Sequence, residues 1–180
     1  MQLTKAEIRA EVRARRALIG HADRPAIAVP AEFRRLLSAG LVVAGYVPMR
    51  DEADPSALID AARDRGCIIA LPRVEGRSTH MDFRRAAVGV AIERSPFGMN
   101  QPQQDAPAIA PDIILVPLMA FARSGARLGH GAGHYDRALA HSSATKIGVA
   151  WARLEYPGLP QDPWDVRLDA IITEREWICV

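Results

Sequence analysis

The order of hydrophobic and polar positions predicts a helix at the start of the chain. Residues 4–16 are mostly charged, and the apolar side chains of Ile8 and Val12 fall on one face at helical spacing. Thr4 and Glu7 have the spacing of a capping box, in which the two side chains satisfy free N–H groups of the first turn. We therefore expect an amphipathic helix that begins at Thr4 and packs on the core through Ile8 and Val12.

A β-α-β unit comes next in the pattern. A second helix is predicted from about Pro30 to Gly40, because proline is favoured in the first turn of a helix and glycine after the last one. The continuous apolar runs at 41–47 and 67–72 have the length of buried strands, and a helical pattern at 55–65 lies between them. Two strands joined through a helix usually pair in parallel, which is typical of an α/β protein.

The remainder of the chain continues this alternation. Further strands are expected at residues 80–85, 112–117, 146–152 and 168–173. A helix is predicted to end near Ala140, and the proline-rich residues 94–111 are expected to form a long ordered loop. The predicted fold is a single α/β domain over residues 1–180. It is a three-layer α/β/α arrangement around a mostly parallel central sheet of about five to six strands.

The composition excludes several classes of protein. The 180 residues carry a formal net charge of +2, which is too small for a protein held to nucleic acid by a dense basic face. No apolar run approaches the roughly 20 residues of a membrane span, and the charged N-terminus lacks the apolar segment of a signal peptide, so no membrane partner is expected. Cys67 and Cys179 stand in apolar runs outside any C-x-x-C motif and are expected to be buried free thiols. A cytoplasmic location is the corresponding expectation.

The segment 127–137, "RLGHGAGHYDR", has glycine at every second position and matches none of the common glycine motifs. A dinucleotide fingerprint requires G-x-G-x-x-G, and a Walker loop ends in Gly-Lys-Ser/Thr, which is absent from the sequence. His130 and His134 are four residues apart, but the glycines between them disfavour the helix that would bring them onto one zinc ion. The segment therefore calls for an explanation other than these motifs.

Alternate glycines allow the chain to adopt positive φ and to direct successive N–H groups into one anion-binding concavity. A helix that begins just afterwards adds its own free N–H groups and the positive end of its dipole. Arg127 supplies a charge, and Asp136 at the helix start could hold a magnesium ion that bridges phosphates. A glycine-rich turn followed by a helix start that Asp136 stabilises explains the segment equally well.

A longer stretch, "DIILVPLMAFARSGARLGHGAGHYDRAL", resembles the signature of the 5-formyltetrahydrofolate cyclo-ligase (5,10-methenyltetrahydrofolate synthetase) family. The likeness covers nearly the whole chain, because "KAEIR", "PMRDEADP", "LPRV", "HMDF" and "LPQDPWDVRLDAIITE" match further family segments in the same order. The chain departs from the family pattern at Ala122, His134 and Trp164, where Asp, Tyr and His are usual. Arg73 of "LPRV" is given no role in the site.

The resemblance implies an ATP- and magnesium-dependent ligase. Such an enzyme cyclises 5-formyltetrahydrofolate to 5,10-methenyltetrahydrofolate by phosphorylation of the formyl oxygen, with release of ADP and phosphate. The matching positions imply ATP binding by Lys5, Arg9, Arg127, Leu128, Gly129, His130, Gly131, Ala132, Gly133, His134 and Tyr135. They imply folate binding by Val47, Glu52, His130 and His134, and magnesium binding by Asp136 and Asp162. No residue is assigned as catalytic.

Each of these positions also has a purely structural explanation. Lys5 and Arg9 are four residues apart and could form a solvated basic face of the first helix. Glu52 could be an exposed loop charge, Val47 a core residue, and Asp162 part of a turn. The alternative function is a non-catalytic nucleotide- or folate-binding relative. A sugar-phosphate isomerase or CoA-transferase on a similar sheet would require a catalytic Glu or an Asp–His pairing, and the sequence shows neither. A monomer or weak homodimer is expected.

Overall fold

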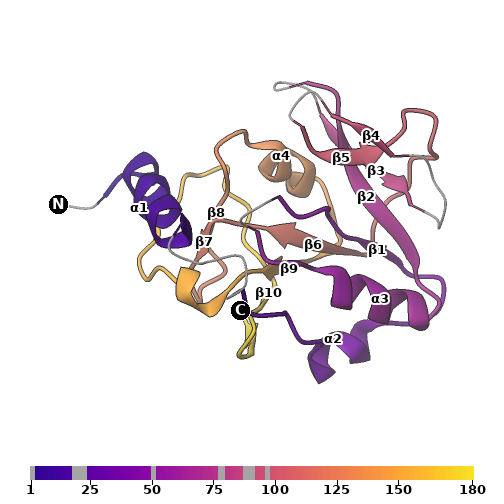
Figure 1. Cartoon of the computed structure of the whole chain (residues 1–180), viewed down its shortest axis with the longest axis horizontal. Helices are drawn as coiled ribbons and strands as arrows, with labels where there is room; N and C mark the ends of the chain where they lie inside the picture. The colour runs from indigo at the N-terminus through magenta and orange to yellow at the C-terminus, as the bar shows by residue number, and fades with distance from the viewer. Residues whose placement is uncertain (1–2, 18–23, 50–51, 77–79, 87–91, 96–97) are drawn as a thin grey trace.

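The computed structural model describes residues 3–17, 24–49, 52–76, 80–86, 92–95 and 98–180. A seven-stranded sheet forms the centre of the protein (Figure 1). In spatial order its strands are β11 (Trp177–Cys179), β10 (Ala170–Ile172), β9 (Thr145–Val149), β6 (Ile113–Pro117), β1 (Val42–Ala44), β2 (Ile68–Val74) and β3 (Met81–Arg85). The predicted strands at 41–47, 67–72, 80–85, 112–117, 146–152 and 168–173 are all confirmed, with shifted ends.

The sheet is parallel in its interior and antiparallel at both edges. The neighbours β10, β9, β6, β1 and β2 pair in parallel, and β11 and β3 pair antiparallel at the two edges. Central strands covered on both faces are expected to be apolar throughout, and every residue of β1 is buried, as are the first four of β6. The predicted mostly parallel α/β class is therefore confirmed, although the sheet has more strands than expected.

The helices lie on both sides of this sheet. They are α1 (Lys5–Ala17), α2 (Ala31–Leu36), α3 (Ser56–Asp64) and α4 (His134–Ala140), with a short 3-10 helix at Ala152–Leu154. Figure 1 shows α2 and α3 on one side of the sheet and α4 on the opposite side, with α1 at one end of the molecule. The capping box is present, because the Thr4 N–H and hydroxyl both donate to Glu7 Oε2 at 2.7 Å.

Two predictions about local structure are wrong. The second helix ends at Leu36 rather than Gly40, because Leu37 adopts an extended conformation and is buried. Residues 94–111 are not one loop, since β4 (Ile92–Arg94) and β5 (Asn100–Pro102) form a separate two-stranded sheet. Propensity did not reveal β5, because its sequence "NQP" has no strand-forming residue.

A second small sheet connects the core to the glycine segment. In it, β7 (Ala120–Phe121) pairs antiparallel with β8 (Arg127–Leu128), and the Met119 N–H donates to the Leu128 carbonyl at 2.7 Å. Phe121 and Leu128 are both buried, so the chain enters the glycine segment from a fixed position.

The two cysteines differ in exposure. Cys67 is a buried free thiol as expected, but Cys179 is exposed, which corrects the prediction for that residue. Cys179 lies on the edge strand β11, where its neighbour Ile178 faces the core and Cys179 faces outward. No helix in the described part of the chain has the length and apolar character needed to cross a membrane. The single-domain organisation stays a prediction.

Candidate functional site

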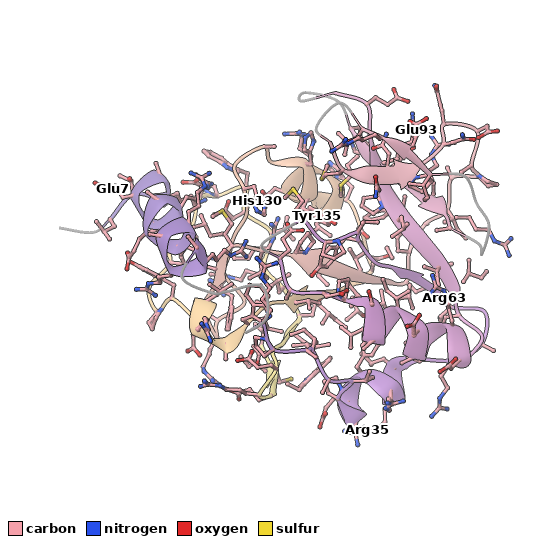
Figure 2. All side chains as sticks on the ribbon, in the orientation of Figure 1. Glu7, Arg35, Arg63, Glu93, His130 and Tyr135 are labelled. Carbon is pink, nitrogen blue, oxygen red and sulfur yellow. The ribbon has the colours of Figure 1, made fainter. Side chains whose placement is uncertain are left out.

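One cavity of about 1150 Å³ collects every residue that the sequence analysis placed in the site. It lies where β1, β2 and β6 reach their carboxyl ends, the edge of a parallel sheet at which ligands usually bind. Figure 2 shows His130 and Tyr135 near the middle of the molecule, between Glu7 of α1 and Glu93 of the β4–β5 hairpin. The predicted residues that line the cavity are Lys5, Arg9, Val47, Glu52, Arg127 to Asp136 and Asp162.

The glycine segment forms the floor of one end of this cavity. Gly131 has φ 103° and Gly133 has φ 69°, values that side-chain-bearing residues rarely adopt. A Cβ atom at Gly133 would lie 2.9 Å from Arg137 Nη1, the movable end of a side chain, so the positive φ rather than lack of space favours glycine there. Gly129 does not have positive φ, and its carbonyl accepts a hydrogen bond from Arg9 Nε at 2.9 Å. Two of the three glycines therefore have the conformation expected of an anion-binding segment.

Lys5 and the acidic residues after Leu159 close the same end of the cavity. Lys5 Nζ donates to Asp162 Oδ2 at 2.7 Å and to Asp165 Oδ2. Burial acts to lower the pKa of Lys5, but the hydrogen bonds to the two carboxylates outweigh it, and the net effect is a raised pKa. Lys5 is therefore a fixed positive charge in the cavity, rather than a member of a solvated face.

Arg127 and Asp136 form an ion pair between the start of the glycine segment and the first turn of α4. Arg127 Nη2 donates to Asp136 Oδ1 at 2.5 Å, and the side chain of Arg127 is only 3% exposed. Asp136 thus compensates a buried charge in addition to any contact that it makes with a ligand.

The residues predicted to bind magnesium, Asp136 and Asp162, would supply carboxylate oxygens. Asp136 and Asp162 both line the cavity, but each pairs with a cationic side chain. Within the described residues, no group of three or more His, Cys, Asp or Glu side chains could hold a metal by itself. Magnesium commonly binds one or two carboxylates together with substrate phosphates, so these residues fit an ion that arrives with a nucleotide.

Glu52 and Tyr135 supply buried polar groups in the middle of the cavity. Glu52 is 6% exposed, and its Oε2 accepts a hydrogen bond from the Met49 N–H at 2.9 Å while its Oε1 lies 3.7 Å from His130 Nδ1. The Tyr135 hydroxyl is buried without a hydrogen-bond partner among the described residues. Burial raises the pKa of Tyr135, and the charge of Glu52 raises it further against the opposing charge of Arg127. The hydroxyl therefore stays a donor.

The sequence analysis did not predict the apolar residues that line the other end of the cavity. Its lining residues include Met49, Pro72, Val74, Met81 and Met99, which read in the sequence as core or loop positions. Asn100, Gln101, Trp164 and Asp165 also line the cavity. The similarity of "LPRV" and "HMDF" to family segments was the one available signal, since Pro72, Val74 and Met81 lie in these two stretches.

The three departures from the family pattern lie in different surroundings. Ala122 is buried beside β7 and does not line the cavity. His134 is the first residue of α4, and its Nδ1 lies 3.1 Å from Arg137 Nη2. Trp164 lines the cavity and is 69% exposed.

Comparisons with known proteins identify the family of the chain. A model of the 5-formyltetrahydrofolate cyclo-ligase family matches residues 2–174. The chain is 34% identical over 149 residues to the 5-formyltetrahydrofolate cyclo-ligase of Mycolicibacterium smegmatis, which covers 77% of this chain and 76% of the relative. It is 30% identical over 138 residues to that of Haemophilus influenzae, with 72% and 74% covered.

Two solved structures have the same fold. The NMR structure of Aquifex aeolicus 5,10-methenyltetrahydrofolate synthetase superposes with a TM-score of 0.80 at 28% identity, over 98% of this chain and 93% of the other. The 5,10-methenyltetrahydrofolate synthetase of Mycoplasma pneumoniae superposes with a TM-score of 0.66 at 21% identity, over 96% and 99%, which supports the fold alone. The chain therefore belongs to the 5-formyltetrahydrofolate cyclo-ligase family.

Proposed function

We propose that the protein is an ATP- and magnesium-dependent enzyme that cyclises 5-formyltetrahydrofolate to 5,10-methenyltetrahydrofolate and releases ADP and phosphate. One observation carries this proposal: a single cavity joins a glycine-lined end, which holds both basic side chains and carboxylates, to an end lined by apolar side chains, and the buried carboxylate of Glu52 lines the same cavity. The first end suits a triphosphate and the second a fused ring system, so the cavity can hold the two substrates side by side.

The charged end is assigned to ATP. Lys5, Arg9 and Arg127 bring three positive charges to a segment whose N–H groups and following helix start favour anions. Arginine binds phosphate through two parallel donors, and Lys5 adds a point charge. These groups neutralise charge that moves between the phosphoryl group and its acceptor, which is the main requirement of phosphoryl transfer.

The apolar end is assigned to the reduced folate. Val47 lines the cavity beside Met49, and Glu52 presents a carboxylate that can accept hydrogen bonds from ring N–H groups. His130 lies next to Glu52, and the Tyr135 hydroxyl remains available for a ligand. A buried hydroxyl with no partner among the described residues usually indicates a missing ligand or water, so we assign it to the bound substrate.

The chemistry follows from the poor leaving ability of a formamide oxygen. The formyl oxygen attacks the γ-phosphorus of ATP, and ADP leaves with the electron pair of the broken P–O bond. The N10 amine then bonds to the formyl carbon and loses its proton, and inorganic phosphate departs with the formyl oxygen. The residues of the cavity contribute by holding the formyl oxygen, the γ-phosphate and the amine in reacting positions.

Asp136 and Asp162 would hold magnesium through carboxylate oxygens. The ion, when bound with ATP, neutralises phosphate charge. Arg127 would then share Asp136 with the metal, and Lys5 would share Asp162. The monomeric or weakly dimeric state and the cytoplasmic location stay predictions.

The proposal is tested by incubating the purified protein with Mg-ATP and 5-formyltetrahydrofolate. The methenyl product has a conjugated system, so its near-ultraviolet absorbance should rise at a rate proportional to the enzyme concentration. Omission of ATP, magnesium or folate should abolish the rise. Binding of both ligands by the folded protein without any rise would contradict the enzymatic function and support a non-catalytic relative.

A further inference from the structure

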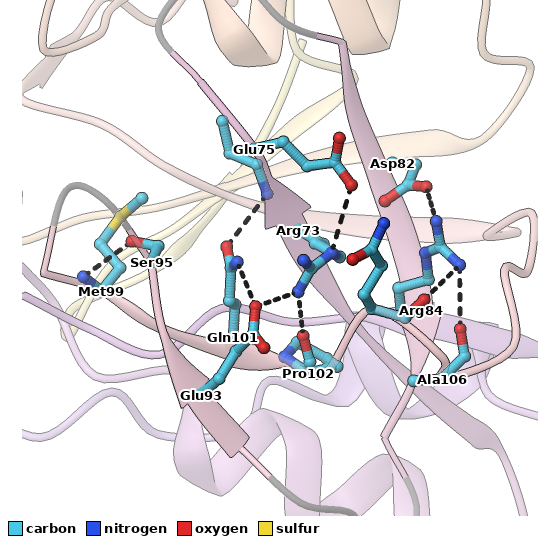
Figure 3. Close-up of polar contacts among 12 residues, drawn as sticks. Arg73, Glu75, Asp82, Arg84, Glu93, Ser95, Met99, Gln101, Pro102 and Ala106 are labelled. Atoms are coloured by element: carbon cyan, nitrogen blue, oxygen red, sulfur yellow. Dashed lines mark hydrogen bonds and ion pairs between the residues drawn. The ribbon is translucent and has the colours of Figure 1, made fainter.

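Arg73 of β2 is a buried arginine to which the proposed reaction gives no role. Its side chain is 7% exposed, and its Nη1 donates both to Glu93 Oε1 at 2.5 Å and to the Pro102 carbonyl at 2.7 Å. Glu93 belongs to β4 and Pro102 to β5, so one guanidinium joins both strands of the hairpin to the central sheet (Figure 3). A buried charge is costly unless it is paired. The guanidinium therefore favours the arrangement in which Glu93 and Pro102 remain in contact with it.

Gln101 of β5 extends the same junction. It is 3% exposed, and its Oε1 accepts the Val74 N–H of β2 at 3.1 Å while its Nε2 donates to Glu93 Oε1 at 3.3 Å. The hydrogen bond from Arg73, followed by that from Gln101, lowers the pKa of Glu93. The Glu93 carboxylate therefore remains charged and is held by two donors from different strands.

This junction determines where one wall of the cavity lies. Met99, Asn100 and Gln101 of the hairpin line the cavity, as does Val74 of β2. The β4–β5 pair is a sheet separate from the central one, and an isolated two-stranded hairpin is only marginally stable. In the described part of the chain, the hairpin does not pair with the strands of the central sheet. The side-chain contacts of Arg73 and Gln101 therefore hold it against β2.

We propose that Arg73 is a positioning residue that holds the β4–β5 hairpin as a wall of the substrate end of the cavity, and so sets the affinity for the folate rather than for ATP. The inference rests on the proposed function. The phosphate end is built from α1 and the glycine segment, and Figure 1 shows α1 and the hairpin on opposite sides of the molecule. Displacement of the hairpin should therefore weaken the binding of the folate more than the binding of ATP.

Two substitutions weaken the junction with little change in shape. Glu93→Gln removes the counter-charge of the buried Arg73 and should lower the melting temperature, but the glutamine amide oxygen can still accept a weaker hydrogen bond at a side chain that is 38% exposed, so the variant should still fold. Arg73→Lys keeps the positive charge but replaces the rigid planar guanidinium, whose Nη1 donates to both acceptors, with an ammonium group on a flexible stem. Each variant should raise the KM for 5-formyltetrahydrofolate about five- to tenfold, with the KM for ATP and kcat within about twofold of the wild type, the pattern of lost ground-state binding.

Arg84→Lys is the matched control. Arg84 lies on the neighbouring strand β3, and its guanidinium also joins a carboxylate to backbone carbonyls (Figure 3). It donates to Asp82 at 2.6 Å and to the carbonyls of Gln104 and Ala106 at 3.3 and 3.0 Å, but it does not line the cavity. This variant should lower the melting temperature and leave both KM values unchanged.

Equal increases in both KM values, or a lower melting temperature without any change in the KM for the folate, would show that Arg73 is only structural. If Arg73→Lys fails to fold, Glu93→Gln decides the question. The dissociation constant of 5-formyltetrahydrofolate, measured by calorimetry without ATP, should rise by the same factor as KM. A wild-type protein that neither binds nor converts this folate would overturn the proposed function itself, whereas an active wild type with unaffected variants would overturn only the role of Arg73.

Discussion

Replacing Asp136 with asparagine removes a charge from the cavity while nearly preserving the shape of the side chain. From the sequence, this change is expected to leave the melting temperature almost unaltered, because asparagine also suits a helix start. The structure revises that expectation. Asp136 accepts a hydrogen bond from Arg127 at 2.5 Å, and the Arg127 side chain is 3% exposed, so the variant leaves a buried guanidinium without its counter-charge.

The expected loss of stability follows from the exposure of the two partners. A hydrogen bond to a charged group contributes about 1.5–3 kcal/mol, and breaking a fully buried ion pair costs about 3–5 kcal/mol. Asp136 is 26% exposed, and the asparagine amide oxygen can still accept a weaker bond, so the lower range applies. A loss of about 2 kcal/mol corresponds to a decrease of roughly 4–8 °C in melting temperature for a domain of this size.

Thermal unfolding without nucleotide or metal measures this effect directly. Asp60→Asn is the control, because Asp60 accepts a hydrogen bond from Arg63 at 2.8 Å while both side chains are largely exposed on α3. An exposed pair contributes at most about 1 kcal/mol, so the control should lower the melting temperature by no more than about 2–4 °C. The magnesium dependence of the reaction is then titrated for both variants, and only Asp136→Asn should require more magnesium.

Two results would contradict these two roles of Asp136. If Asp136→Asn and Asp60→Asn lower the melting temperature equally, Asp136 does not compensate the buried charge of Arg127. If the melting temperature falls as expected but half-saturation by magnesium is unchanged, Asp136 supports Arg127 and takes no part in metal binding.

Three further predictions concern the nucleotide end and the first helix. Lys5→Ala and Arg9→Ala should each raise the KM for ATP more than the KM for the folate, because each loses a charge-assisted phosphate contact of about 1.5–3 kcal/mol; equal small changes in both constants would contradict a role in ATP binding. Trp164 is exposed in the cavity, so Mg-ATP should change the tryptophan fluorescence, and a response that persists in Trp164→Phe would assign the change elsewhere. The Thr4 N–H, and then its hydroxyl, lower the pKa of Glu7, so this cap stabilises the fold fully above about pH 4.3 and loses its effect as the pH falls through the lowered value. Glu7→Gln should therefore flatten the acid-side decrease in melting temperature, and parallel curves for the two proteins would contradict this.

Short-range patterns predicted most of the fold. The capping box of Thr4 and Glu7 marked the start of α1, and the apolar runs at 41–47 and 112–117 marked central strands, because a buried parallel strand must be apolar on both faces. The pattern failed where tertiary contacts override propensity. Leu37 leaves helical geometry and is buried, and β5 forms from "NQP" because it pairs with β4.

The parts of the candidate site that consist of residues adjacent in the sequence could be predicted. Gly131 and Gly133 have the positive φ that the glycine spacing suggested. The ion pair of Lys5 with Asp162 spans 157 positions, and no local pattern indicates it. The role of Arg73 was equally hidden, because its partners lie on a hairpin that has no sequence signal of its own.

In the proposed reaction, the formyl oxygen of the folate becomes part of a phosphate ester in this cavity. This step is tested by supplying 5-formyltetrahydrofolate labelled with ¹⁸O in the formyl group, together with unlabelled Mg-ATP, and by analysing the inorganic phosphate by mass spectrometry. Each phosphate released should carry one ¹⁸O atom, and the labelled phosphate should equal the ADP and the methenyl product in amount. Formation of the methenyl product with unlabelled phosphate, or with the label recovered in water, would contradict this step.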